Sequence, residues 1–228
     1  MLKPFACFFT LALAVGPLAV DAQSSISIPL NDRSGWQVLE FRRIPPHRIR
    51  FSAAGLEMKV ESSAMPVIYP LSKATRVAAV RVKGRVAGTL HLPPGRQGEP
   101  GFDDYAFRIG LVEPGDRTLN FVQRPLAAPW VHRLFDLAPP GGGISRIHFL
   151  NVGAAGEPVG RRRQHPSSDL LEEQVVAALR ADGRLDFTHT LERPLDTIAL
   201  WLSSDGDDTA SSFTVLVEEI ELRIAENR

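Results

Sequence analysis

Cysteine is almost absent from this sequence. The chain has one, Cys7, within the first 22 residues, and that segment has the features of a secretory signal peptide. Lys3 is followed by an apolar run from Phe5 to Val15, and the segment ends at Val20-Asp21-Ala22, after which a signal peptidase would cut. Cys7 lacks the residues that precede a lipoprotein cysteine. We therefore expect residues 23–228 to form the mature chain, without a thiol, a disulfide or a lipid anchor.

Long apolar runs and a net charge are missing as well. The apolar core of the signal peptide is too short to span a bilayer, and no later stretch approaches the ~20 apolar residues of a membrane helix. The 26 basic residues balance the 26 acidic ones, and cleavage after Ala22 removes one of each, Lys3 and Asp21. The sequence thus predicts a soluble periplasmic or secreted domain with no nucleic-acid interface and no transmembrane segment in the mature chain.

The usual catalytic motifs are also absent. The histidines show no zinc-binding spacing, and neither a Gly-x-Ser-x-Gly elbow nor a phosphate-binding glycine loop occurs. These absences remove the usual support for a zinc enzyme, a serine hydrolase or a nucleotide-binding protein. The six histidines are His47, His91, His132, His148, His165 and His189.

What the sequence does contain is apolar and polar residues in alternation, which is typical of half-buried strands. The pattern runs through residues 56–61, 80–86 and 105–112, while 144–152 and 197–203 are more continuously apolar, as expected for central strands. Loops rich in proline and glycine separate them. We predict one all-β domain over residues 23–228, a single β-sandwich of jelly-roll or galactose-binding-like type.

Two local features depart from this regular pattern. Residues 169–181 place Leu171, Val175 and Leu179 at helical spacing after Asp169, which predicts one crossover helix. In the last strand one apolar alternation runs through odd positions up to Val217 and another through even positions from Ile220. This change of the buried side between Glu218 and Glu219 predicts a β-bulge there.

Acidic residues mark a candidate metal site near the C-terminus. The stretch "DGDDT" at 205–209 has the composition of a turn between strands, and it also offers the carboxylates of Asp205, Asp207 and Asp208 to a structural Ca²⁺. The spacing is not that of the helix-loop-helix calcium site. Both interpretations stay open, and no other cofactor is indicated.

A second group of residues could bind a sugar. Asp103, Asp104, Tyr105 and Arg108 lie at the start of one expected strand, where they could hydrogen-bond hydroxyls, and Trp130 could offer a stacking face. Charge pairing across the sheet is the alternative for the polar residues. The three arginines in "VGRRRQH" (159–165) could grip a phosphate or uronate group, or be solvated surface charge.

Four segments carry a resemblance to a known family. "FDDYAFRIGLV", "ISRIHFLNVG", "SSDLLEEQVVAALRADG" and the block from "LDTIALWLSSDGDDT" to "VEEIELR" resemble the exported bacterial proteins catalogued as domain of unknown function 3047. The likeness spans most of the mature chain, and it extends distantly to the jelly-roll carbohydrate-binding modules, in which an acidic stretch near the last strand can hold calcium. It implies the β-sandwich fold, and the family has no assigned activity.

The function hypothesis from sequence is a noncatalytic module that binds a carbohydrate or envelope glycan. One alternative is a glycan hydrolase or lyase that uses carboxylates in a cleft. Another is a protein-interaction module of an envelope assembly. No residue is assigned a catalytic role.

The predicted export can be tested directly. We expect the protein recovered from the periplasm or the medium to begin at Gln23, because the signal would be removed after Ala22. N-terminal sequencing checks this, and recovery of an uncleaved chain in the cytoplasm would contradict it.

Overall fold

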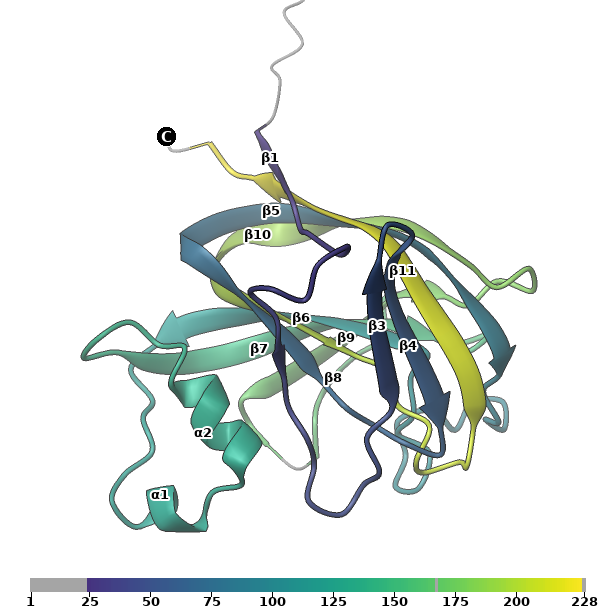
Figure 1. Ribbon diagram of the computed structural model, residues 1–228, viewed down its shortest axis with the longest axis horizontal. Helices are drawn as coiled ribbons and strands as arrows, with labels where there is room; N and C mark the ends of the chain where they lie inside the picture. Colours follow the sequence, from purple (N-terminus) through teal and green to yellow (C-terminus); the bar gives the residue numbers. More distant parts are fainter. Residues whose placement is uncertain (1–23, 167, 227–228) are drawn as a thin grey trace, which may run out of the picture.

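The computed structural model describes residues 24–166 and 168–226, so the predicted signal peptide lies outside the described residues. Strands make up nearly all of the regular structure, which confirms the predicted all-β fold (Figure 1). The strands are β1 (Ser25–Ser27), β2 (Gln37–Val38), β3 (Arg48–Ser52), β4 (Gly55–Glu61), β5 (Val67–Thr89), β6 (Phe107–Gly115), β7 (Gly143–Gly153), β8 (Arg162–Gln164), β9 (Leu171–Ala178), β10 (Arg184–Ser203) and β11 (Ser212–Ile224). The two helices are α1 (Gln123–Leu126) and α2 (Pro129–Phe135).

All these strands belong to one hydrogen-bonded sheet. Its order is β3-β4-β11-β5-β10-β6-β7-β9-β8, with β1 added to β11 and β2 to β5. Among the described strands the pairings are antiparallel except for β7 with β9, which are parallel. A parallel pair needs a crossover connection, and residues 154–170, which contain β8, supply it.

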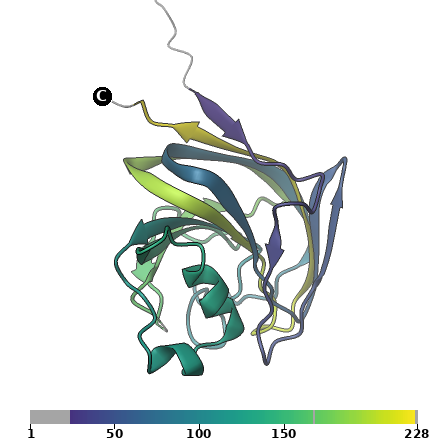
Figure 2. The same ribbon diagram turned by 60° about the vertical axis from the view of Figure 1, so that its left-hand side comes forward.

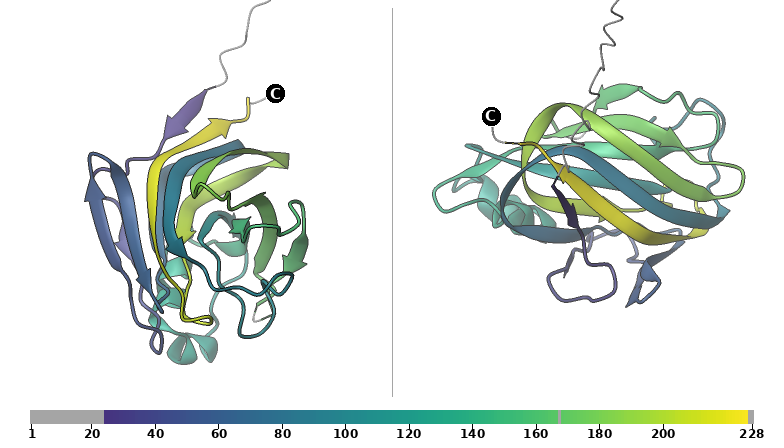
Figure 3. Two further views of the ribbon diagram at one scale, coloured as in Figure 1. Left: turned by 90° about the vertical axis from the view of Figure 1, so that its right-hand side faces the viewer. Right: turned by 90° about the horizontal axis from the view of Figure 1, so that it is seen from above.

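The sheet curls into two facing layers because β5 and β10 are long and bent (Figure 3). The first part of β10 pairs with β5 near residues 79–85, and its last part pairs with both β5 and β6. The register of β10 against β5 shifts between Thr190 and Leu195 and again between Thr197 and Ala199. Strands that pass from one layer to the other at such irregularities make the corners of a sandwich.

The main core fills the space between the layers. Val215 and Val217 of β11 belong to the same buried cluster as Leu111 of β6, Leu150 of β7 and Leu200 of β10. Full burial of an aliphatic side chain of this size contributes about 1.5–3 kcal/mol. Burial of the apolar side chains that alternate along these strands therefore drives folding.

A second cluster lies on the other side of β6, β7 and β10. It includes Phe149 and Trp201, and Leu134 of α2 is buried in it. The short helices lie to one side of the curled sheet (Figure 2). Trp130, also on α2, packs edge-on against Trp201 with ring centroids 5.8 Å apart. Helix α2, which the sequence did not predict, thus covers an apolar face that would otherwise meet water.

The helix predicted near residues 169–181 is wrong, because Leu171–Ala178 forms strand β9. The sequence of this segment fits both the helical and the strand periodicity. The residues that are buried, Glu173 and Val175, are two positions apart, as in a strand. Glu173 is drawn inward by two arginines, and Asp169 pairs with Arg117 instead of capping a helix. Tertiary contacts override the local helical pattern.

The β-bulge predicted in the last strand is confirmed. The register of β11 against β5 shifts between Val217 and Glu219, so Val217 and Ile220 are both buried while Glu218 is exposed. Within the part of the chain that the structure describes, no helix is long and apolar enough to cross a membrane.

The loop before β3 makes stability depend on pH. Burial lowers the pKa of His47 from 6.5 to about 4, so between these values the unfolded chain binds a proton that the folded chain does not. The contribution of His47 to stability is therefore fully present above pH 6.5 and is lost as pH falls towards 4, by about 3 kcal/mol in all. We expect His47→Leu to reduce this loss in urea unfolding at pH 7 and pH 4.5, whereas a change at exposed His91 (His91→Gln) leaves it unaltered. Equal pH dependence in the wild type and His47→Leu would contradict the assignment.

Candidate functional site: a buried ion network and a charged cleft

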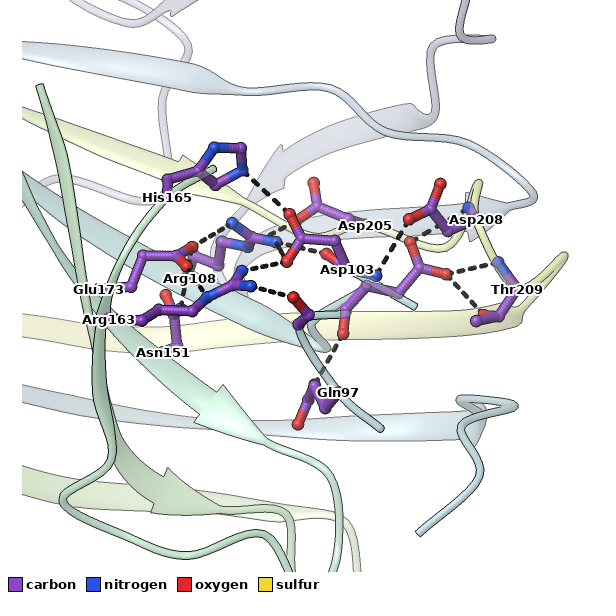
Figure 4. Close-up of polar contacts among 12 residues, drawn as sticks. Gln97, Asp103, Arg108, Asn151, Arg163, His165, Glu173, Asp205, Asp208 and Thr209 are labelled. Carbon is purple, nitrogen blue, oxygen red and sulfur yellow. Dashed lines mark hydrogen bonds and ion pairs between the residues drawn. The ribbon is translucent and has the colours of Figure 1, made fainter. Parts of the chain in front are cut away.

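A buried arginine at the start of β6 organises the first site. The guanidinium of Arg108 lies 2.8 Å from Glu173 of β9 and 2.8 Å from Asp205, in the loop after β10 (Figure 4). It also approaches Asp103 at 3.5 Å and stacks 4.2 Å above the ring of Tyr105. We call Asp103, Arg108, Arg163, Glu173 and Asp205 the Arg108 network.

Arg163 of β8 is the second cation of the network. Its guanidinium contacts the carboxylates of Asp103 and Glu173 and the backbone carbonyl of Gly98. His165 lies at the edge of the network, with its Nε2 atom 3.0 Å from Asp103. Residues from β6, β8, β9 and two loops are therefore tied together by charge-assisted contacts.

The network perturbs the ionisation of its members. Burial alone would raise the pKa of Asp103, but the hydrogen bond from His165 and the charges of Arg108 and Arg163 hold it at about 2. Burial raises the pKa of Asp205 to about 7, although Arg108 opposes this. Burial also disfavours charge on Arg108, yet the surrounding carboxylates outweigh it and its pKa lies above the usual value.

Three side chains of this region have the types and spacing of metal ligands. Asp103, His165 and Glu173 place their ligand atoms within 4.8 Å of one another. Both carboxylates already contact the guanidinium of Arg163, however, and a cation would meet that positive charge. The grouping favours an ion-pair network over a metal site.

The structure also brings the two acidic motifs together. Asp104 accepts hydrogen bonds from the backbone of Thr209 at 2.8 Å and from its hydroxyl at 2.5 Å, and Asp208 accepts one from the backbone of Asp103 at 3.0 Å. Asp104 therefore orders the "DGDDT" turn. The Ca²⁺ site predicted at Asp205, Asp207 and Asp208 stays a prediction.

The predicted sugar-binding residues fall in two places. Asp104, Tyr105 and Arg108 are only 1, 1 and 7% exposed, and Asp103 contacts Arg163 and His165. Trp130 packs against Trp201 and belongs to the helical cover, outside the Arg108 network. Whether these residues contact a ligand stays a prediction.

A charged cleft lies on the opposite face of the same strands. It has a volume of about 420 Å³ and opens between β7, β8, β9 and the bend of β10. Its polar lining includes Arg146, His148, Arg162, Glu172, His189 and Arg193, and Leu150, Leu191 and Leu195 add apolar surface. We refer to it as the charged cleft.

Alternation along β9 explains why one strand serves both sites. Successive side chains of a strand point to opposite faces. Glu173 therefore faces the Arg108 network and is 2% exposed, whereas Glu172 faces the charged cleft and is 41% exposed. Arg162 and Arg163 on β8 divide in the same way, because they pair with Gln174 and Glu173.

A histidine between two carboxylates lies beside the charged cleft. The Nε2 atom of His148 is 3.0 Å from Glu113, and its Nδ1 atom is 3.2 Å from Glu172. These residues come from β6, β7 and β9, where His148 pairs directly with Glu172. An imidazole held on both nitrogens by carboxylates can pass a proton between them.

Sequence reasoning missed most of the charged cleft. The "RRR" motif pointed to Arg162, but His148, Glu172 and Arg193 carried no motif of their own. The one usable signal was "LERP" at 191–194, where Pro194 interrupts the alternation of a strand and indicates an irregularity. That irregularity is the β10 bend that forms one wall of the cleft.

Comparisons with known proteins give weak structural likenesses. No family model and no curated protein matches the chain, so membership of the domain of unknown function 3047 family stays a prediction. A xylan-binding module, CBM15, aligns with a TM-score of 0.38 and 11% identity over 90% of this chain and 99% of its own. Xylanase10C from Cellvibrio japonicus, in complex with xylopentaose, aligns with a TM-score of 0.36 and 11% identity, over 89% of this chain and 29% of its own. The Crh5 transglycosylase aligns with a TM-score of 0.34 and 12% identity, over 89% of this chain and 85% of its own. With all three TM-scores below 0.5, function must be argued from the residues of the site.

The Arg108 network predicts a large loss of stability when its central cation is removed. We expect Arg108→Met to destabilise the fold by about 3–5 kcal/mol, because it leaves buried carboxylates without their partner. Urea unfolding measures this, with Arg50→Met as the control, since Arg50 pairs with Glu57 on the surface and is 66% exposed.

Glu173→Gln is the milder variant if Arg108→Met fails to fold. It keeps the shape of the side chain and removes one buried charge, so it should also unfold at a lower urea concentration than the wild type. Network variants as stable as Arg50→Met would contradict the structural role.

Proposed function

We propose that this protein is an exported, noncatalytic module that binds a carbohydrate or envelope glycan in the charged cleft. The observation that carries the proposal is the lining of this cleft, which combines guanidinium donors, carboxylate acceptors and apolar side chains. A sugar hydroxyl both donates and accepts hydrogen bonds, and the ring carbons offer apolar contact. A concave site with convergent polar groups suits such a ligand.

The position of the cleft supports the same proposal. Its residues come from strands β7, β8 and β9 and from the β10 bend, so the site is held by the sheet. The Arg108 network braces β8 and β9 from the other face. A preorganised site of this kind loses little conformational entropy when a ligand binds.

The site residues predicted from sequence take a supporting place in this proposal. Asp103 and Arg108 hold Glu173 and Arg163, and Asp104 orders the turn at 205–209, around which a Ca²⁺ would have a structural role. The module would act in the periplasm or outside the cell, as the predicted signal peptide implies.

A glycan-array screen of residues 23–228 tests the proposal, once with calcium and once with a chelator. We expect binding to a defined set of glycans, and a chelator effect only if the 205–209 turn holds calcium. Absence of binding in both conditions would overturn the carbohydrate proposal for the glycans displayed.

Arg162→Ala locates the binding site. Removing this guanidinium deletes charge-assisted donors at the cleft, so we expect an affinity about tenfold lower in titration calorimetry. Arg50→Ala is a matched control, because Arg50 and Arg162 are both exposed and both form two hydrogen bonds to a glutamate. Equal affinities of the two variants would place the ligand elsewhere.

A second candidate function is favoured by His148. Its contacts with Glu113 and Glu172 supply an acid and a base beside the cleft, as a glycan hydrolase or lyase needs. Incubation of the bound glycans with the wild type and with His148→Asn separates the two functions. Product formation lost in His148→Asn would establish the enzyme, whereas binding without product in either protein supports the noncatalytic module.

A further inference from the structure

The hydrogen-bonding groups of the charged cleft are unevenly used. Every carboxylate oxygen of the glutamates that line the cleft (Glu172, Glu173 and Glu192), and of Glu113 beside it, already has a partner. The two oxygens of Glu113 contact His148 at 3.0 Å and Arg193 at 3.5 Å, and those of Glu172 contact Arg146 and His148. Both oxygens of Glu192 accept hydrogen bonds from Arg162, at 3.0 and 2.6 Å. Each of these carboxylate oxygens is therefore already engaged by a side chain of the protein, and a ligand hydroxyl would have to share it.

The guanidinium donors of the cleft are only partly used. Each guanidinium carries about five N–H donors in a planar fork. Arg193 has a single contact among the described residues, the 3.5 Å approach to Glu113, and its side chain is 64% exposed. Arg146 contacts Glu172 through Nη1 alone, and it is 39% exposed at the same cleft. The cleft thus offers donors and positive charge to a ligand far more readily than it offers acceptors.

From this asymmetry we propose that the glycan bound in the charged cleft is acidic, with a uronate carboxylate that pairs with Arg193. The inference rests on the proposed function and deepens it. A planar carboxylate matches the guanidinium fork, and the pairs of Arg146, Arg162 and Arg193 with glutamates show that all three side chains reach carboxylates from their positions in the cleft. Neutral parts of the same glycan would contact Leu191 and Gln164, which line the cleft beside these arginines.

Arg193, and not Arg162, determines the preference for an acidic glycan, because Arg193 can bind a carboxylate without breaking an existing bidentate pair. The bidentate pair of Arg162 with Glu192 would have to open before Arg162 could receive a ligand carboxylate. Arg193 lies one residue after Glu192 in the β10 bend, where the register against β5 shifts, and most of its side chain already faces solvent. A ligand carboxylate can approach its free N–H groups directly.

The experiment compares uronate oligosaccharides with their carboxyl-reduced counterparts, which keep the chain length and linkages but lack the charge. We expect the wild-type residues 23–228 to bind the acidic form at least about tenfold more tightly in calorimetry, and to lose this preference as NaCl is raised. Arg193→Gln should bring the ratio of the two affinities close to one, through weaker binding of the acidic form. Arg50→Gln, on the distant β3–β4 hairpin, should leave the ratio unchanged.

The outcomes distinguish the two proposals. Equal binding of the acidic and reduced forms would overturn the uronate inference and leave glycan binding standing. Preference for a sulfated glycan of the same backbone over the uronate would also overturn it. No binding of acidic, sulfated or neutral glycans would remove the proposed function and the inference together.

Discussion

The buried guanidinium of Arg108 is the contact on which the rest of the site depends. It joins Glu173 of β9 to Asp205 after β10 and to Asp103 before β6, segments that are far apart in the sequence. Withdrawing these charges from water is costly, and the mutual contacts with Arg163 offset that cost. Such a network stabilises only one arrangement of its strands, since any other leaves a buried charge without a partner.

This arrangement sets the register of β9 and, through it, the charged cleft. A slip of one residue would turn Glu172 towards Arg108 and Glu173 towards His148, and would reverse every other side chain of the strand. The parallel pairing of β7 with β9 carries Glu172 directly beside His148. The placement of the side chains that line the charged cleft on one face of the layer is thus fixed by ion pairs on the other face.

Much of the fold could be predicted from the sequence, but little of the site. Alternation located the strands and even the bulge at Glu218, because both follow from which side chains avoid water. It failed at residues 169–181, where Glu173 is buried by partners that no local pattern reveals. Asp103 and Asp205 each stood out as part of an acidic motif, yet only long-range strand pairing shows that they share Arg108. The cleft could not be predicted, because one of its walls is a bend within β10 that the alternation pattern does not reveal.

The central position of β5 has a consequence for how the chain folds. Its two main hydrogen-bonding partners, β10 and β11, both lie in the last quarter of the sequence, and the short strand β2 pairs only with Val67 and Ile68. Synthesis proceeds from the N-terminus, so the 23 residues of β5 emerge long before β10 and β11 exist. Contacts of such high sequence separation make folding slow, and an unpaired apolar strand of this length is prone to aggregate meanwhile. β5 therefore has to avoid pairing with strands of other molecules until its own C-terminal partners arrive.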